Sequence, residues 1–517
     1  MNNSSYIHNT LRNIISGLFN RGIMILLPFI NRTAILWLLG AEFTGLTGLF
    51  TSILSVLNLA DLGFNSAIVY SLYEPISKRD EKTICALVSL LRRIYYITGT
   101  LILIAGLVIL PFITKFIHGS YPNTVNIYIL FFLYLLDTVI SYYLFAYKEA
   151  ILIADQRQDI INNIRSGVLI ICYLLQFLIL IISRNFYLFM WMSIASTLVN
   201  NFLVQVATRK YYPFFKLVKR VPRMSANLKK QLYGLAINKI SDTCRNSFDG
   251  IIISSFLGLT ATAIYGNYYY VYSALYGIML VIANSMSASI GQCILKKNTS
   301  YNYHQLLLFS LLFTGLVTWA CTYMACLYQP FMQLWVGKSL VLPTYSMLLF
   351  CVYFYIINLN NIRNQYTSGT GLWWKMRYVY ILEAVGNLGL NILFGKFYGI
   401  NGILWATIIT IFCFNFLCQT DILFHNYFKG CSLFHFLKEQ AYYGFITIVC
   451  ITGTYWLCVY FFEQATLLSL LGRFAICALV PPIIFVSLVW PTKRFKQAQN
   501  FIQQIIHTYL KRKKQNA

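Results

Sequence analysis

Acidic residues are scarce in this sequence. Only 15 of its 517 residues are Asp or Glu, against 40 Lys or Arg, and all charged residues together make up 11%. A soluble domain carries about 25% charged residues, so this low content excludes an ordinary soluble protein. Hydrophobic residues make up 58% and lie in long continuous runs. Such runs predict membrane-spanning helices, whereas a β-barrel would show short alternating segments.

Signatures of catalysis and of cofactor binding are also missing. No HExxH, GxSxG or GxxxxGK[ST] pattern occurs, and the six histidines lie far apart. ATP hydrolysis is therefore not expected, and transport would be driven by the substrate gradient or by H⁺ or Na⁺ coupling. The 13 cysteines are scattered, mostly in apolar runs, without a CxxC pair. Cysteine there behaves as a small apolar residue, so the sequence predicts no metal site. Because catalytic and cofactor motifs are missing, it also predicts no cofactor and no enzyme activity.

Fourteen apolar segments are each near the ~20 residues that a helix needs to cross a bilayer. They predict an all-α polytopic membrane protein. The polar start MNNSSYIHNT leads into the first segment without a small-residue cleavage site, so no cleavable signal peptide is expected. The segments are 13–39, 43–74, 88–113, 124–150, 164–183, 186–208, 231–258, 264–295, 305–330, 343–366, 378–399, 401–425, 441–462 and 467–490.

Lysine and arginine are distributed unevenly among the loops. With the N-terminus in the cytoplasm, 29 of them fall on the inner side, four on the outer side and seven within the spans. Arg363 is counted among the inner-loop residues. Positive residues favour the cytoplasmic side, so both termini are predicted to be cytoplasmic. This distribution also explains the net charge of +25 without a nucleic-acid partner.

A sequence pattern recurs after 218 residues, with Arg21 corresponding to Lys239 and Gly40 to Gly258. Each copy contains an even number of spans, so the two have the same orientation and are related by an axis along the membrane normal. The predicted organisation is an N-terminal six-helix lobe, a basic cytoplasmic linker, a C-terminal six-helix lobe, two extra helices and a basic cytoplasmic tail. These parts cover 10–208, 209–230, 231–425, 441–490 and 491–517.

Four cations inside the predicted spans are candidate substrate-binding residues. Arg21 and Arg32 are eleven residues apart in the first span and share a helix face. Lys239 and Arg245 lie in the seventh span. An ionisable group at mid-bilayer costs ~2.5–3.5 kcal/mol, so it usually faces a cavity or a partner. These side chains could therefore hold an anionic ligand in a hydrated cavity.

Four aspartates are candidates for ion coupling or for structural polar contacts. Asp242 and Asp249 alternate with the two cations of the seventh span at spacings of 3, 3 and 4. This pattern predicts a self-neutralising ladder, a polar wall of a substrate cavity, or both. Asp61 lies in the second span and Asp137 in the fourth.

Other charged residues near the ends of spans are expected to be solvated or to reach the headgroups. Arg473, alone in the last span, is expected to reach the outer headgroups. The residues expected near cytoplasmic ends are Glu74, Lys148, Glu149, Glu383 and Asp421.

The stretch LGAEFTGLTGLFTSILSVLNLADLGFNSAIVYSLYEPI, from Leu39 to Ile76, resembles the multidrug/oligosaccharidyl-lipid/polysaccharide (MOP) flippase superfamily, and within it the Wzx-type polysaccharide exporters of bacteria. As architecture, the resemblance extends over residues 10–490. It implies a MATE-like V-shaped cavity lined by spans 1, 2, 7 and 8, with alternating access between two six-helix lobes.

The function implied by this resemblance is a flippase in the bacterial cytoplasmic (inner) membrane. Its cargo would be an undecaprenyl pyrophosphate-linked oligosaccharide for surface polysaccharide synthesis, whose anionic head group the four cations could hold. The nearly balanced charges of the predicted spans weaken this picture of a cationic cavity. Expected partners are membrane lipids, a polysaccharide polymerase and glycosyltransferases, and a monomer is the expected state.

Three alternatives remain. A MATE-type drug or cation antiporter is favoured by the carboxylates of span 7, although span 1 contains none. A peptidoglycan lipid-precursor flippase differs mainly in its cargo. A membrane glycosyltransferase or polymerase belongs to another class, and it usually carries a large outer loop for its chemistry. Here no predicted outer loop exceeds about fifteen residues, which argues against this class.

Overall fold

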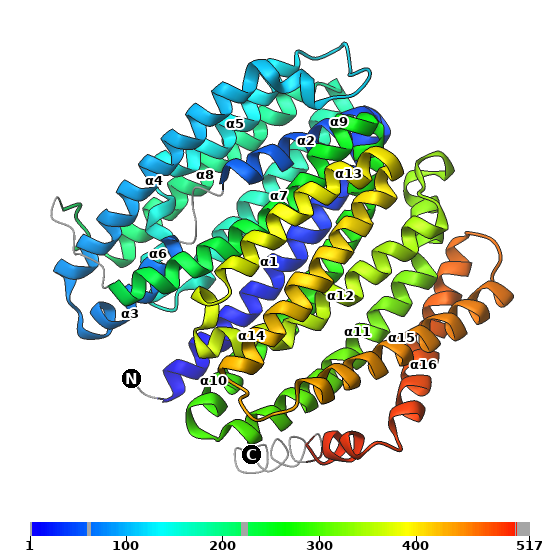
Figure 1. The fold of residues 1–517 in the computed structure, drawn as a ribbon. Coiled ribbons are helices and arrows are strands. Elements are labelled where there is room, and N and C mark those ends of the chain that lie inside the picture. Colours follow the sequence, from blue (N-terminus) through cyan, green and yellow to red (C-terminus); the bar gives the residue numbers. More distant parts are fainter. Residues whose placement is uncertain (1–2, 59–63, 219–225, 502, 504–517) are drawn as a thin grey trace. The chain divides into compact units, whose positions relative to one another are not determined.

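The computed structural model describes residues 3–58, 64–218, 226–501 and 503. Every element in this described part is helical (Figure 1). The chain divides into two compact units, Met1–Gly266 and Asn267–Ala517. This boundary lies inside one long helix, α9 (Ala226–Ser285). The lobe limits inferred from the sequence repeat remain a prediction.

Unit 1 begins with a 36-residue helix, α1, and continues with helices α2 to α8, each of which is shorter than α1. Two 3₁₀ segments, Leu110–Phe116 and Ala146–Lys148, follow α4 and α5. The helices are α1 (Asn3–Leu38), α2 (Ala41–Leu57), α3 (Phe64–Lys78), α4 (Glu81–Ile109), α5 (Ile127–Tyr143), α6 (Glu149–Ala154), α7 (Gln158–Ser183), α8 (Phe186–Tyr211) and the first part of α9.

Unit 2 holds the rest of α9 and seven further α-helices, with a π-helix at Ile411–Cys418 between α13 and α14. The last two helices pack against α11 and against each other, as the lower right of Figure 1 shows. The helices are α10 (Ser287–Lys296), α11 (Thr299–Val336), α12 (Thr344–Thr370), α13 (Arg377–Thr410), α14 (Gln419–Asn426), α15 (Leu433–Phe461) and α16 (Leu467–Val489).

Helix starts follow local sequence signals. The side chains of Asn126 and Asn185 accept hydrogen bonds from backbone N–H groups in the first turns of α5 and α8. Asn298 and Thr466 do the same for α11 and α16. These N-caps satisfy donors that have no partner within the helix, so the short polar residues between the apolar runs fix where the helices begin.

Ten helices in the described part of the chain are long and apolar enough to cross a membrane, or eleven when a bent pair beginning at Ile127 is one span. Two of the ten, Ala236–Lys296 and Arg377–Asn426, contain 61 and 50 residues. A continuous helix of that length would extend about 75–90 Å, whereas the hydrocarbon core is about 30 Å thick. Each must therefore supply more than one crossing.

Glycines with positive φ divide these two long helices. Gly258 has φ 85° and ψ −179°, and Gly399 has φ 58° and ψ −138°. The divisions agree with the sequence, which separated spans at 258 and at 399. They explain much of the difference between ten or eleven helices and the fourteen predicted segments. Ala41–Leu57 is also apolar, but it is shorter than the full spans.

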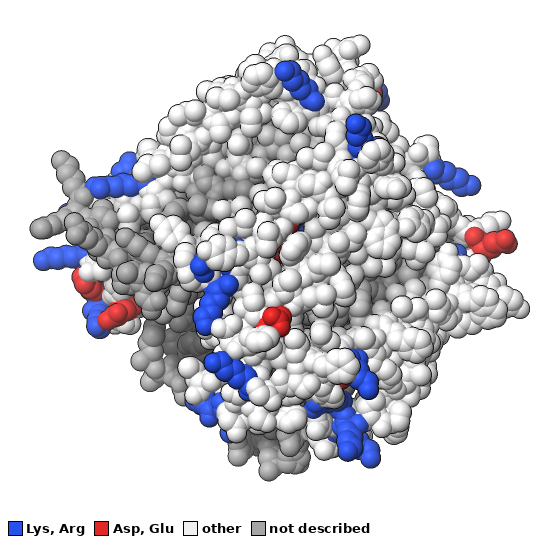
Figure 2. Space-filling model, viewed as in Figure 1, with Lys and Arg blue, Asp and Glu red and all other residues white. Residues whose placement is uncertain are grey.

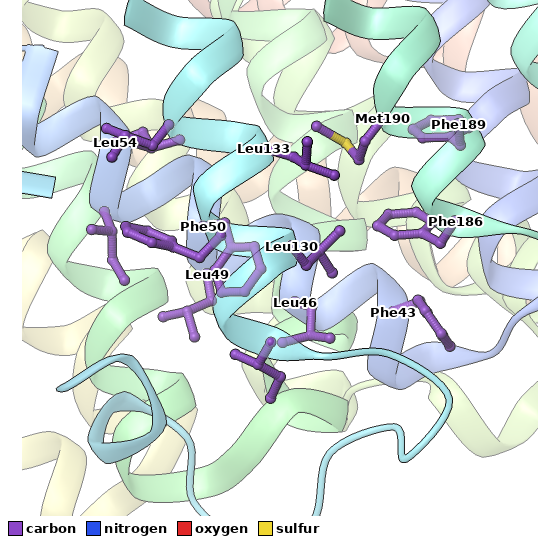
Figure 3. Close-up of a cluster of buried hydrophobic side chains, with 14 of the residues drawn as sticks. Phe43, Leu46, Leu49, Phe50, Leu54, Leu130, Leu133, Phe186, Phe189 and Met190 are labelled. Carbon is purple, nitrogen blue, oxygen red and sulfur yellow. The ribbon is translucent and has the colours of Figure 1, made fainter. Parts of the chain in front are cut away.

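The core of unit 1 forms where α2, α5 and α8 converge. Phe50 on α2 meets Phe131 on α5 edge to face, with ring centroids 5.4 Å apart. Phe43 meets Phe186 on α8 in the same way at 5.2 Å. Aromatic pairs favour such edge contacts. Figure 3 shows Phe43, Phe50 and Phe186 together with Leu46, Leu49, Leu54, Leu130, Leu133, Phe189 and Met190.

Small residues let α2 pack closely against α9 on both sides of Gly258. A Cβ atom added to Gly45 would lie 2.1 Å from the backbone oxygen of Leu259. A Cβ at Gly250, just before the break in α9, would lie 2.5 Å from the hydroxyl of Ser52. Close backbone approach at small residues is typical of helix pairs in membranes. Glycine is therefore required where these helices cross.

Candidate functional site

Two asparagines fasten α1 to α7 inside unit 1. Asn20 donates to the hydroxyl of Ser166 at 3.0 Å, and Asn31 donates to the side-chain oxygen of Gln176 at 2.9 Å. Both asparagines are buried. They are eleven residues apart, which is also the spacing of the two candidate arginines that follow them in the sequence. Polar contacts along one helix face thus set the rotation of α1.

The two arginines of α1 have different surroundings. Arg21 is exposed, whereas Arg32 is partly buried. A Cβ added to Gly266 would lie 2.7 Å from a terminal nitrogen of Arg32, so this guanidinium reaches α9. Arg32 is therefore held within the helices of unit 1. Arg21 is the more exposed of the pair.

The polar ladder predicted in the seventh span is formed in part. Arg245 is 4% exposed and bonds to Asp242 at 2.8 Å. Asp249, which is 1% exposed, accepts a hydrogen bond of 2.8 Å from the hydroxyl of Tyr265. This bond joins the two parts of α9 across the break at Gly258. Lys239 lies on the same helix and is exposed.

Asp137 links α5 to α8. Its two carboxylate oxygens accept hydrogen bonds from Ser193 at 2.9 Å and from Thr197 at 2.7 Å. A carboxylate with two neighbouring hydroxyl groups can exchange a proton, and its oxygen atoms are also ligands that hard cations prefer. Asp61, the other aspartate predicted in the first six spans, lies outside the described residues.

Unit 2 contains a buried polar network that the sequence prediction missed. Arg363 is 1% exposed and donates to side-chain oxygens of Asn415 and Gln419, each at 3.0 Å. It also donates to the backbone oxygen of Asn415. The side-chain nitrogen of Asn415 in turn donates to Glu383 at 3.2 Å. A buried cation and a buried carboxylate are therefore bridged by one amide.

This network corrects two predictions. Arg363 lies inside the predicted span 343–366 but is counted among the inner-loop residues, whereas the structure places it buried within α12, which continues to Thr370. Glu383 was expected to be solvated, but it is 1% exposed. The polar run NLNNIRNQYTSG contains no proline, and no glycine before Gly369, so nothing in it ends the helix at Arg363.

The π-helix lies at this network, since Asn415 belongs to it. Nearby, Asn387 of α13 donates to the hydroxyls of Thr407 and Thr410, each at 3.3 Å. Asn391 donates to Asn387 at 3.1 Å. Short π-helical segments are frequent at functional sites. The polar side chains here are therefore a second candidate site, separate from the cations of unit 1.

Three other charged residues near helix ends also differ from expectation. Arg473 is 6% exposed and donates to backbone oxygens, including that of Cys326 at 3.0 Å, instead of reaching headgroups. Lys148 is 6% exposed and bonds to Gln205. Glu149 is largely buried and lies 3.5 Å from Arg165. In each case a neighbouring helix offers a polar partner, which a single-helix argument cannot include.

Two of the expected solvated carboxylates are exposed as predicted. Glu74 pairs with Lys78 at 2.6 Å on the surface, and the hydrogen bond and charge of this lysine lower the pKa of Glu74. Asp421 is also exposed and lies 3.1 Å from His425. Figure 2 shows that most of the visible helix surface carries no charged side chain, as a lipid-facing surface requires.

No protein-family model and no curated protein matches this chain. Solved structures do match it. The lipid II flippase MurJ in an inward closed conformation aligns with a TM-score of 0.65 and 16% identity, over 93% of this chain and 99% of that chain. An inward-facing multidrug resistance MATE family transporter of the MOP superfamily aligns with a TM-score of 0.57 and 15% identity, over 77% and 94%. A Vibrio cholerae MATE transporter aligns with a TM-score of 0.51 and 16% identity, over 82% of this chain and 99% of that chain.

The chain has the MurJ and MATE fold. The predicted fold class, an all-α polytopic membrane protein, is confirmed. At identities of 15% and 16% this likeness concerns the fold alone and assigns no residue a role. On this MurJ-like fold, the binding roles of Arg21, Arg32, Lys239 and Arg245 remain predictions. The same holds for the four aspartates.

Proposed function

We propose that this protein is a flippase that moves an undecaprenyl pyrophosphate-linked oligosaccharide across the cytoplasmic membrane for surface polysaccharide synthesis. The observation that carries the proposal is the alignment with a lipid II flippase over 93% of this chain and 99% of that chain. The MATE alignments reach 77% and 82% of this chain. The greater coverage favours a lipid-linked cargo over a drug.

The exposed cations support an anionic head group. Arg21 and Lys239 occupy corresponding positions of the sequence repeat, and both side chains are exposed within helices that span the membrane. Exposed ammonium and guanidinium groups at membrane depth suit a pyrophosphate, which accepts several charge-assisted hydrogen bonds. The isoprenoid tail would remain in the lipid while the two lobes alternate between inward and outward access. Both termini stay in the cytoplasm.

Arg32 and Arg245 have a different role in this proposal. Arg32 is partly buried, and Arg245 is paired with Asp242. Both would orient the exposed cations and adjust the local potential instead of making the main contacts with the head group. The nearly balanced charge of the spans is consistent with this division, since the buried aspartates offset the buried arginines.

Two other cargoes are tested by the same experiment. A peptidoglycan lipid precursor carries a related anionic head group, so the same cations would bind it. A drug or cation exchanged for H⁺ or Na⁺ would use carboxylates instead. Asp137, held between two hydroxyl groups, is the structural feature that favours this second cargo.

The test is deletion of the gene, followed by measurement of lipid-linked saccharides and surface polysaccharide in the same cells. We expect surface polymer to fall while one lipid-linked oligosaccharide accumulates on the cytoplasmic side, and that species identifies the cargo. Accumulation of the peptidoglycan precursor would instead identify that precursor as the cargo. Unchanged polysaccharide with increased sensitivity to cationic drugs would contradict the proposal and support antiport.

A further inference from the structure

Three cysteines from three helices meet inside unit 2. Cys326 on α11, Cys458 on α15 and Cys477 on α16 are each fully buried. Their sulfur atoms all lie within 4.8 Å of one another. The three thiols are free, so no disulfide links them. These three residues, called the thiol cluster below, lie where α15 and α16 pack on α11 (Figure 1).

A proline and a tryptophan fix the position of Cys477. Pro481 has no N–H group, so the backbone oxygen of Cys477, four residues earlier, lacks its usual partner in the helix. The indole nitrogen of Trp319 on α11 donates to this oxygen at 2.8 Å. Such replacement partners are how prolines are tolerated in membrane helices. The bond holds α16 against α11 at the level of the thiol cluster.

Arg473 makes a second link between the same helices. It lies one turn before Cys477 on α16 and donates to the backbone oxygen of Cys326 at 3.0 Å. It also donates to the backbone oxygen of Phe462. The third guanidinium donor, Nε–H, is buried and has no hydrogen-bond partner. The guanidinium is thus fixed beside the thiol cluster.

Among the described residues, no carboxylate forms an ion pair with Arg473. Its side chain is 6% exposed, and in the described part of the chain its bonds go only to neutral backbone oxygens. A buried charge without a counter-ion is costly. Metal binding would supply the missing negative charge, because thiols become negatively charged thiolates when they coordinate a metal ion.

We propose that the thiol cluster binds one soft metal ion, monovalent copper, with Arg473 as its counter-charge. Cu⁺ displaces the protons of all three thiols, which leave as three H⁺, so each sulfur coordinates as a thiolate. The metal and the three thiolates together carry two negative charges, one of which the guanidinium offsets. The oxidation state of copper does not change.

The number and kind of ligands select the ion. Metal–sulfur bonds of about 2.3 Å in a trigonal site need sulfurs about 4 Å apart, which small side-chain shifts within the cluster provide. Zinc in structural sites takes four ligands, and the group found here in the described residues has three. Soft thiolate ligands favour Cu⁺. A loaded site would join α11, α15 and α16 more firmly than packing alone.

The test is a titration of the full-length protein, purified in detergent under reducing and anaerobic conditions. Cu⁺ is supplied as its complex with bicinchoninate, and its transfer to the protein is followed by the loss of the chelator's colour. We expect transfer of one Cu⁺ per chain, and at least a tenfold lower affinity in Cys458→Ala and in Cys477→Ala. Arg473→Gln should also lower the affinity about tenfold.

The matched control is Cys450→Ala. Cys450 is also fully buried on α15, but it does not belong to the thiol cluster, so its variant should bind as the wild type does. Size-exclusion chromatography shows which variants fold, and Cys458→Ser replaces any alanine variant that does not. Cu⁺ should raise the melting temperature of the wild type and of Cys450→Ala only.

Four results would overturn the proposal. The first is a wild-type protein that takes no Cu⁺ from the chelator. The second is equal binding by the wild type and by a folded variant of the thiol cluster, which would place the metal at other cysteines. The third is a disulfide between two of the three cysteines, found by mass spectrometry of the protein as isolated. Binding of Zn²⁺ with no binding of Cu⁺ would equally exclude the assigned ion.

Discussion

Gly40 and Gly258 have the same unusual backbone conformation. Their φ and ψ angles are 101° and 173° for Gly40, and 85° and −179° for Gly258. This region is essentially restricted to glycine. The two residues are 218 positions apart, which is the offset of the sequence repeat. Gly119 and Gly337, with φ 80° and 83°, have the same separation. The copies thus repeat a backbone conformation as well as a sequence pattern.

Replacement of Gly258 by alanine should destabilise the protein more than the same change at Gly40. Both positions have positive φ, which should cost about 1–3 kcal/mol for a residue with a Cβ atom. At Gly258 the new Cβ would also lie 2.7 Å from the backbone oxygen of His118, whereas nothing lies within 4 Å at Gly40. Melting temperatures of the purified variants measure the difference. Gly167→Ala, in open space within α7, is the control and should be neutral or stabilising. Equal losses at both sites would contradict the prediction.

Glycine should stabilise the protein at two positions where the first copy has larger residues. Gln156 and Arg184 have φ angles of 58° and 51°, and the residues 215 positions later are Gly371 and Gly399, with φ 67° and 58°. A left-handed conformation costs a non-glycine residue about 1–2 kcal/mol. Gln156→Gly and Arg184→Gly should each raise the melting temperature. Ser183→Gly, in the last helical turn of α7, should lower it, and a lower value for all three would disprove the idea.

Loss of either exposed cation should impair transport without impairing folding. Arg21→Ala and Lys239→Ala should each reduce surface polysaccharide at least tenfold in a complemented deletion strain, because each removes a charge-assisted contact worth about 1.5–3 kcal/mol. Protein abundance in the membrane should not change. Lys338→Ala, which removes a cation from a connecting segment, is the control. Normal export by both variants would remove these residues from the substrate path.

The charge of Asp137 should matter more for the coupling of transport to H⁺ or Na⁺ than for folding. Asp137→Asn retains an oxygen that can accept a hydrogen bond from Ser193 or Thr197, so we expect a change in melting temperature equivalent to about 1 kcal/mol or less. If Asp137 exchanges H⁺ or Na⁺, the variant loses the dependence of transport on that ion. The measurement is export at varied pH and Na⁺ concentration. The same substitution at Asp61 should also reduce activity, and full activity of both variants would assign structural roles to them.

Arg363 and Glu383 should be energetically coupled through Asn415. Arg363→Met leaves the buried carboxylate without the cation that faces it, which should destabilise the protein by about 3–5 kcal/mol. Adding Glu383→Gln should recover part of this loss because it removes the unbalanced charge. A double-mutant cycle of unfolding free energies measures the coupling. Additive losses would show that the two charges act independently.

The sequence by itself determined the all-helical, membrane-spanning character of the chain and two places where long helices break, at 258 and at 399. The length of each apolar run is a local property, and so is the need for glycine at Gly40 and Gly258. The fold class follows from these features, because a chain with so many apolar runs buries its backbone hydrogen bonds in helices. The same reasoning placed Arg21 and Lys239 within apolar helices, whereas the exposure of their side chains came from the structure.

Only the tertiary structure decided which polar and thiol groups are buried together. Arg363 finds Asn415 and Glu383 on neighbouring helices, although a single-helix argument placed both charges at solvated ends. Arg473 likewise bonds to a carbonyl of α11 instead of reaching water. The thiol cluster joins three helices that are distant in sequence. The partners of a buried group depend on how helices pack, and no local pattern contains that information.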